Sequence, residues 1–176
     1  GGYKIVTTFD KGIQAEAGAS VKEIRPDGIP EVNTALAAVE PGTGALKAMY
    51  GGPDFLKSQL NWATLGTQPG STFKVFAVIA GLRDGYSLQT KLYGNSPITI
   101  GKDTVSNAGD ARGASYGTVT LAKAVQSSVN TAFIDLTDQM EAGPQKILDA
   151  ARDAGISQST IDKMNPVIGV SLGYAP

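Results

Sequence analysis

Two side chains near the middle of the chain have the types and spacing of a catalytic pair. Ser71 and Lys74 stand one helical turn apart, at the start of the apolar run Val75–Leu82. Residues i and i+3 share a face of an α-helix, so a helix here places the serine hydroxyl beside the lysine amine. A hydroxyl next to a positioned base is the general arrangement of an activated nucleophile. The pair predicts nucleophilic catalysis by Ser71 with Lys74 as the base.

The sequence around Lys74 favours its burial. It is the only charged residue between Lys57 and Arg83, and a helix that is apolar on all sides belongs in a core. Burial disfavours the ammonium form, lowers the pKa of the lysine and makes a neutral amine accessible near physiological pH. The alternative interpretation is a Ser71 helix cap followed by a lysine whose amine reaches solvent.

The composition excludes several other chemistries. The 176-residue chain contains no His and no Cys, so a Ser-His-Asp triad, a Cys or His zinc site and a disulfide framework are all impossible. We predict neither a metal nor a cofactor. The formal net charge of −1, with both signs mixed along the chain, predicts no nucleic-acid partner. The longest apolar run is far shorter than the roughly 20 residues that span a bilayer.

Periodicity and turn signals predict an α+β fold. The pattern predicts strands over 3–9, 34–40 and 45–50, the last two forming an antiparallel hairpin around the turn Pro41-Gly42-Thr43-Gly44. It predicts helices over 10–25, 71–85, 118–127, 131–140 and 144–154, with Asp10 and either Thr118 or Thr120 as caps, and short extended pieces at 97–100 and 104–106. Three strands make a thin sheet. We therefore expect an antiparallel sheet flanked by helices plus a helical subdomain, incomplete in this chain.

A second polar group, Ser127-Ser128-Val129-Asn130, falls at the junction between two predicted helices. Ser and Asn favour helix ends because they bond to free backbone groups, so this group alone is a weak signal. Combined with Ser71 and Lys74, it forms a Ser-x-x-Lys followed by a Ser-x-Asn. That combination resembles the active-site motifs of the penicillin-binding proteins and serine β-lactamases.

Further sequence blocks narrow this resemblance, over nearly the whole chain, to the transpeptidase domain of class A, bifunctional penicillin-binding proteins. The blocks follow one another in order: Gly2-Tyr3-Lys4-Ile5-Val6-Thr7-Thr8-Phe9-Asp10, Ala38-Val39-Glu40-Pro41-Gly42-Thr43-Gly44-Ala45, Gly51-Gly52-Pro53-Asp54-Phe55, Asn61-Trp62-Ala63-Thr64 and Gln68-Pro69-Gly70-Ser71-Thr72-Phe73-Lys74.

The resemblance implies a role for each of four residues. Ser71 would attack the carbonyl between two D-alanines of a peptidoglycan stem peptide, and Lys74 would take its proton. Ser128 would relay a proton to the leaving D-alanine, and Asn130 would bind the substrate backbone and orient Lys74. An amine of a second stem peptide would then attack the acyl-enzyme on Ser71 and form the crosslink, and a β-lactam would acylate the same serine.

The chain departs from the family pattern in one important respect. The third motif, Lys-Thr-Gly or Lys-Ser-Gly on a strand that supplies an oxyanion-hole N–H, is absent from these residues, and losing one such donor costs about 10²–10³ in rate. We therefore expect this chain to be the N-terminal portion of the domain, nearly inactive without a C-terminal fragment. Thr67 and Val75 replace residues that are often Arg and Pro in the family.

The resemblance also implies a membrane-anchored parent protein with this domain on the extracytoplasmic face. Three alternatives remain open: a D,D-carboxypeptidase or β-lactamase, a catalytically silent β-lactam-binding or scaffolding module, and an unrelated Ser-Lys amidase. A class A β-lactamase would have Asp where Val129 stands.

Several other residues have a structural and a functional interpretation. Asn61 and Asn107 could line the cleft, but asparagines in loops usually bond to local backbone. Trp62 could form a cleft wall, although a half-buried position at a core rim is the more common role. Structural roles are also expected elsewhere: a sharp turn for Gly51 and Gly52, and solvated side chains for Asp110 and Arg112.

Overall fold

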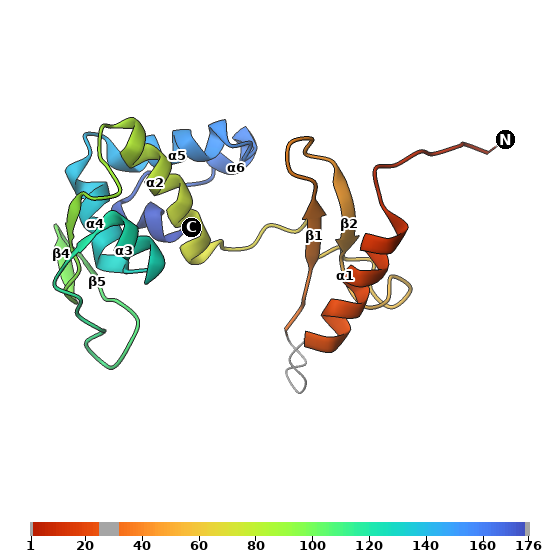
Figure 1. The fold of residues 1–176 in the computed structure, drawn as a ribbon, viewed down its shortest axis with the longest axis horizontal. Helices are drawn as coiled ribbons and strands as arrows, with labels where there is room; N and C mark the ends of the chain where they lie inside the picture. The colour runs from red at the N-terminus through yellow and green to blue at the C-terminus, as the bar shows by residue number, and fades with distance from the viewer. Residues whose placement is uncertain (1, 25–31, 175–176) are drawn as a thin grey trace. The chain divides into compact units, whose positions relative to one another are not determined.

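The computed structural model describes residues 2–24 and 32–174. The chain divides into two compact units, residues 1–67 and 68–176, which we describe separately (Figure 1). Helices and strands both occur, as the predicted α+β class requires. Within the described residues, no helix combines the length and apolarity needed to cross a membrane.

The first unit is one helix packed on one hairpin. Helix α1 (Lys11–Ile24) precedes strands β1 (Leu36–Val39) and β2 (Leu46–Tyr50), which pair antiparallel as predicted. Asp10 caps α1, because its Oδ1 accepts hydrogen bonds from the backbone N–H groups of Gly12 and Ile13. Ala17 and Val21 on α1 and Ala48 on β2 are buried.

The predicted strand over residues 3–9 is wrong. Residues 3–9 form no strand ladder, and Tyr3, Ile5 and Val6 are exposed. Other groups already occupy the backbone of β2: the Asp10 N–H donates to Lys47 O, and the Gln14 carboxamide both accepts from Met49 N and donates to Met49 O. A β-branched sequence does not form a strand without a free partner edge.

The second unit is mainly helical. The 3₁₀ helix η1 (Gly70–Phe73) runs into α2 (Lys74–Arg83), and later elements are α3 (Leu121–Gln126), α4 (Asn130–Gln139), α5 (Gly143–Asp153), α6 (Gln158–Ile161) and the 3₁₀ helix η2 (Ile168–Leu172). Two small antiparallel sheets join β3 (Lys91–Tyr93) to β6 (Thr118–Thr120) and β4 (Ile98–Ile100) to β5 (Asp103–Val105). The predicted α+β class is confirmed, and the strands of the described residues form three separate antiparallel pairs.

The predicted helix over 118–127 begins later than expected. Residues 118–120 form β6, whose three β-branched side chains suit a strand, and β3 provides the partner. Of the two candidate caps, Thr120 is the one that caps α3, because its Oγ1 accepts a hydrogen bond from the backbone N–H of Lys123. Strand β3 and the short helix α6 were not predicted from the sequence.

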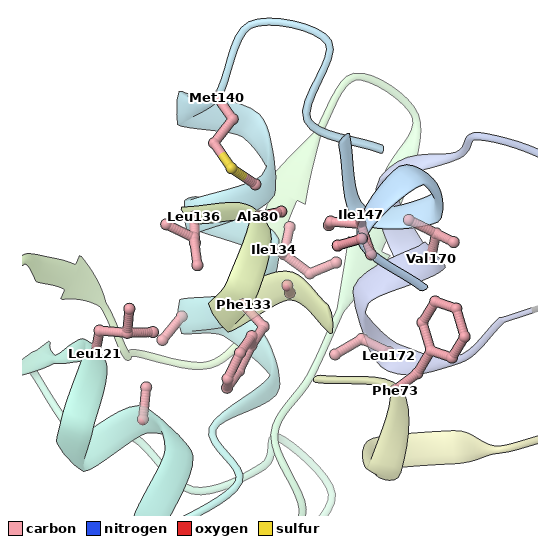
Figure 2. Packing of buried hydrophobic residues seen from close by; sticks show 14 of the residues in the cluster. Phe73, Ala80, Leu121, Phe133, Ile134, Leu136, Met140, Ile147, Val170 and Leu172 are labelled. Atoms are coloured by element: carbon pink, nitrogen blue, oxygen red, sulfur yellow. The ribbon is translucent and has the colours of Figure 1, made fainter. Parts of the chain in front are cut away.

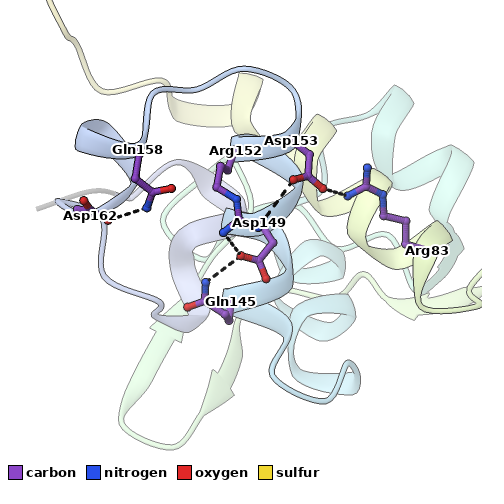
Figure 3. A network of polar contacts seen from close by, with 7 residues as sticks. All are labelled: Arg83, Gln145, Asp149, Arg152, Asp153, Gln158 and Asp162. Carbon is purple, nitrogen blue, oxygen red and sulfur yellow. Dashed lines mark hydrogen bonds and ion pairs between the residues drawn. The ribbon is translucent and has the colours of Figure 1, made fainter.

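Helix α4 lies at the centre of the core of this unit. Phe133, Ile134 and Leu136 are almost completely inaccessible, and side chains from η1, α2, α3, α5 and η2 pack around them (Figure 2). Polar contacts at the surface of α5 connect it to neighbouring elements, with an Arg83–Asp153 ion pair at 2.7 Å that joins α2 to α5 (Figure 3). The packed core thus holds α2 and α4 side by side. Lys74 and Asn130 lie at the first positions of these two helices, and Ser71 and Ser128 lie in the segments just before them.

Candidate active site

Ser71 lies at the surface in the first turn of a continuous helical segment made of η1 and α2. Pro69 precedes the segment, and Gly70 begins it with a positive φ of 57° that favours glycine. The Ser71 side chain is exposed. Because the first N–H groups of a helix have no intrahelical acceptor, the Ser71 N–H is a candidate donor to an oxyanion.

Lys74 lies buried beneath Ser71, as predicted, with only 5% of its surface exposed. Its Nζ is 3.1 Å from Ser71 Oγ, 2.9 Å from Ser128 Oγ, 2.8 Å from Ser128 O and 2.7 Å from Asn130 Oδ1. The ring of Phe133 lies on another side, 5.3 Å from Nζ to its centroid. One amine therefore brings together all four residues singled out in the sequence.

A strained turn positions Ser128. The chain leaves α3 through a Schellman motif, in which Ser128 N–H donates to Val125 O and Val129 N–H donates to Ala124 O. Ser128 occupies the left-handed position with φ 50°, where glycine is usual. This conformation directs both the carbonyl and the hydroxyl of Ser128 toward Lys74. A left-handed non-glycine residue is the kind of local strain that concentrates at functional sites.

Burial lowers the pKa of Lys74 from its ordinary value of 10.5 to about 8. Desolvation of the ammonium is the cause, and the neighbouring acceptors are two hydroxyls and two carbonyl-type oxygens, all uncharged. Within residues 2–24 and 32–174, no carboxylate forms an ion pair with this amine. About a tenth of the amine is therefore neutral at pH 7.

The types of acceptor around Lys74 decide where a neutral amine would direct its lone pair. Ser128 O and Asn130 Oδ1 can only accept, so they take the two N–H groups of the neutral amine. The lone pair then faces the two groups that can donate, the hydroxyls of Ser71 and Ser128. Such an amine can accept a proton from one hydroxyl and return it through the other.

The site opens into a hollow of about 520 Å³. Ser71, Lys74 and Ser128 line one part, and apolar side chains that include Val75 and Val125 line the rest. Both valines are about half exposed, at 52% and 50%. The sequence predicted that this helix would be buried on all sides. One face of α2 is instead partly exposed, because it borders the hollow.

The other polar residues considered in the sequence have structural contacts. Asn61 accepts a hydrogen bond from Ala63 N and lies against Gly51, and Trp62 is half-buried in the first unit. Asp110 and Arg112 are exposed, as expected. Asn107 is buried and bonds to backbone groups.

One contact at the site was not recognisable in the sequence. Gly173, with φ 75°, packs so closely on Gly70 that a Cβ at position 173 would lie 2.4 Å from Gly70 O. The residue that precedes Ser71 is thus held in place by a segment about 100 positions away along the chain. A glycine in a C-terminal segment carries no sequence signal of such a long-range contact.

Proteins of known identity are similar to this chain in sequence. Residues 34–169 match the family described as "Penicillin binding protein transpeptidase domain". Penicillin-binding protein 1A of Mycobacterium tuberculosis is 34% identical over 158 residues, which are 90% of this chain and 18% of the relative. The protein of the same name from Mycolicibacterium smegmatis is 33% identical over 90% of this chain and 19% of its own. The chain therefore spans about a fifth of the length of these relatives.

Solved structures share the fold as well. The penicillin-binding protein PonA1 from Mycobacterium tuberculosis, in complex with penicillin V, superposes with a TM-score of 0.86 at 30% identity, covering 98% of this chain and 47% of that one. Penicillin-binding protein A from the same organism, a penicillin G acyl-enzyme complex, gives 0.68 at 27% identity, covering 86% and 40%. The chain belongs to the penicillin-binding protein transpeptidase domain family.

Proposed function

We propose that this chain is the N-terminal portion of a peptidoglycan D,D-transpeptidase domain that forms an acyl-enzyme on Ser71. The observation that carries the proposal is the position of Lys74 Nζ, buried and within hydrogen-bond distance of Ser71 Oγ, Ser128 Oγ and Asn130 Oδ1. A second support is that family relatives bind penicillins, one of them as an acyl-enzyme.

Acylation begins with the neutral amine of Lys74. Ser71 Oγ attacks the carbonyl carbon of the D-Ala-D-Ala bond while its proton passes to Lys74 Nζ. The carbonyl oxygen becomes an oxyanion that the Ser71 N–H can stabilise. Asn130 Oδ1 and Ser128 O accept hydrogen bonds from the resulting ammonium, which holds its third N–H toward the hydroxyls.

Collapse of this intermediate breaks the C–N bond to the terminal D-alanine. Lys74 gives a proton to Ser128 Oγ, and the proton of Ser128 moves to the leaving nitrogen. D-alanine therefore leaves with a neutral NH₂ group. An amine of a neighbouring stem peptide then attacks the Ser71 ester, forms the crosslinking amide and returns a proton to the serine. A β-lactam follows the first half of this path, with its ring amide in place of the peptide bond.

The wider assignment of the parent protein follows from this proposal. Substrates would be the D-Ala-D-Ala donor and an acceptor amine, and the domain would work on the extracytoplasmic face of the membrane, in a membrane-anchored cell-wall synthase. We propose that a C-terminal fragment of the same domain completes the site. Two facts support it: the chain covers less than half of the solved PonA1 chain, and apolar side chains are exposed around the hollow beside Ser71.

The test is intact-mass spectrometry after incubation with a penicillin, applied to the full polypeptide that carries this chain and to the 176-residue chain alone. We expect one penicilloyl adduct on the full polypeptide, none after Ser71→Ala, and an unchanged adduct after Ser127→Ala. Ser127 is the matched control because it adjoins Ser128 without contacting Lys74. For the isolated chain we expect acylation slower by about 10²–10³, as for loss of one oxyanion donor.

Three results would count against the proposal. Absence of an adduct on the full polypeptide would remove the catalytic assignment and favour a silent module. Rapid loss of the adduct with turnover of the penicillin would indicate a β-lactamase, since a transpeptidase keeps a long-lived adduct. Release of D-alanine without crosslinked product from a stem-peptide pair would indicate a carboxypeptidase.

A further inference from the structure

Asn107 is buried in the loop that follows β5, within the segment that runs from β3 to β6 and includes the β4–β5 hairpin. It is 6% exposed, and its Nδ2 donates to the carbonyl oxygens of Gly94 at 3.0 Å and Ala114 at 2.8 Å. Its own N–H donates to Ser96 Oγ at 3.0 Å. These bonds join both ends of the loop to its middle, so the position of residue 107 is set from several directions at once.

The same side chain also holds the start of α4. Asn107 Oδ1 accepts from the backbone N–H of Thr131 at 3.0 Å and lies 3.3 Å from Thr131 Oγ1. Thr131 N–H is one of the first amide groups of α4, which have no acceptor inside the helix. The residue that precedes α4 is Val129, which has no side-chain acceptor. A distant asparagine thus performs the capping that the local sequence does not provide.

The residue before Asn107 touches the catalytic cluster through its backbone. Ser106 O accepts a hydrogen bond from Asn130 Nδ2 at 3.0 Å, while Asn130 Oδ1 lies 2.7 Å from Lys74 Nζ. A carbonyl oxygen can only accept, so it selects the NH₂ end of the carboxamide. The oxygen end must then face Lys74.

We propose that Asn107 is a positioning residue for catalysis: it holds the Ser106 carbonyl against Asn130 and thereby keeps the oxygen, not the NH₂, of that carboxamide turned to Lys74. The inference rests on the proposed function and extends it to a residue outside the two sequence motifs.

The orientation matters because the neutral amine has a single lone pair. If the carboxamide of Asn130 rotated by half a turn, its NH₂ would donate to Lys74 Nζ and occupy the lone pair that must accept the Ser71 proton. The ammonium form would also lose one of its acceptors. Both effects favour a neutral but blocked amine, so the titration of Lys74 would move to lower pH while acylation slowed.

Charged groups on the surrounding elements do not compete with this effect. Helix α3 carries Lys123, which bonds to Gln126. Helix α4 carries Asp135, whose Oδ2 accepts from Tyr93 N, and the exposed Asp138. The helices η1 and η2 contain no titratable residue. Near Asn107, Asp103 and Asp110 are both exposed.

The test uses the full polypeptide with Asn107→Ala, Asn107→Asp and, as a control, Asn165→Ala at an exposed position. Asn107→Asp keeps an acceptor for the Thr131 N–H but loses the N–H donors to the carbonyl oxygens of Gly94 and Ala114. It therefore separates the effect of capping α4 from the effect of these bonds to the loop. We expect penicillin acylation to slow about tenfold at its pH plateau in both Asn107 variants, and its midpoint to fall by about one pH unit in Asn107→Ala, which adds no charge. Asn165→Ala should match the wild type.

The Lys74 Cε resonance of ¹³C-lysine-labelled protein gives a second readout that needs no turnover. We expect its titration to shift downward in Asn107→Ala, and to show no further shift when Asn107→Ala is added to Asn130→Ala. An unshifted titration in Asn107→Ala, or an equal shift without the Asn130 carboxamide, would overturn the proposal and leave a purely structural role. Wild-type acylation tests the proposed function separately, so the two failures are distinguishable.

Discussion

At the residue scale, the candidate site is organised around one buried amine without a carboxylate partner among the described residues. A carboxylate within contact of Lys74 would stabilise its ammonium form and raise the pKa. Here the neighbours are neutral oxygens, so desolvation is unopposed and the pKa falls to about 8. The arrangement makes Lys74 a candidate base in a chain that lacks histidine.

The pH dependence of acylation follows from this shift. Because only the neutral amine can accept the Ser71 proton, the rate of penicillin acylation should rise with pH and level off above about 8. At pH 6 the neutral fraction, and hence the rate, should be on the order of one hundredth of the plateau. Stopped-flow acylation of the full polypeptide between pH 5.5 and 9.5 measures it. A flat profile through pH 8 would contradict Lys74 as the base.

The strained turn at Ser128 yields a prediction on stability. Glycine adopts φ 50° freely, whereas a residue with a Cβ incurs about 1 kcal/mol or more there. We expect Ser128→Gly to be more stable than Ser128→Ala by about 1 kcal/mol, although both remove the hydroxyl and impair acylation. Urea unfolding measures the difference. Ala142→Gly, at the other left-handed non-glycine position, should stabilise similarly and leave acylation intact.

At the element scale, the helical segment that carries Ser71 depends on elements far away in sequence. The 3₁₀ helix η2 packs on η1, α4 and α5, and Gly173 at its end contacts Gly70. Surface ion pairs such as Arg83–Asp153 contribute little by comparison, typically 0–1 kcal/mol for exposed pairs (Figure 3). Backbone contact, rather than surface charge, therefore supports the segment that carries Ser71.

Gly173→Ala tests this support. The added Cβ would meet the backbone of Gly70, which must shift together with Ser71, and a displacement of about 1 Å at a reacting group can cost on the order of 10²-fold in rate. Gly155→Ala is the matched control, since it has a positive φ of 104° but open space around the new methyl. Both variants have the cost of a positive φ, so we expect both to lose stability, Gly173→Ala the more because of its backbone clash, and penicillin acylation to fall only in Gly173→Ala. Equal acylation rates would show that the Gly70 contact does not position Ser71.

At the scale of the whole molecule, the two units differ in how much core they contain. The buried apolar cluster that includes Phe73, Phe133 and Leu172 belongs entirely to the second unit. The buried apolar residues described in the first unit are Ala17, Val21 and Ala48, and one helix on a two-stranded hairpin is marginal by itself.

We therefore expect residues 68–176 to unfold cooperatively when expressed alone, and residues 1–67 to lack a cooperative transition. Circular dichroism during thermal unfolding distinguishes the two cases. A sharp transition in the isolated first unit, or none in the second, would contradict the assignment of the core.

The second unit also has an exposed apolar face beside Ser71. Binding of an apolar dye to this face should be weaker in the full polypeptide than in the isolated second unit.

The amino-acid sequence was enough to predict the candidate Ser-Lys pair and most local structure. The Ser71–Lys74 spacing, the missing histidine and the apolar run fixed the candidate pair, because helical periodicity places residues three apart on one face. The hairpin, the Asp10 and Thr120 caps and four of the predicted helices depend on nearby residues, so they were predictable, and the family followed from blocks in order.

Features that depend on residues far apart in the sequence became visible only in the tertiary structure. Residues 3–9 have the composition of a strand, yet other groups bind the edge of β2. The meeting of Ser128 and Asn130 with Lys74, the capping of α4 by Asn107 and the approach of Gly173 to Gly70 all join segments separated by many residues. Local sequence encodes backbone preference and side-chain chemistry, whereas hydrogen-bond partners and close backbone contacts across the chain exist only once the core has packed.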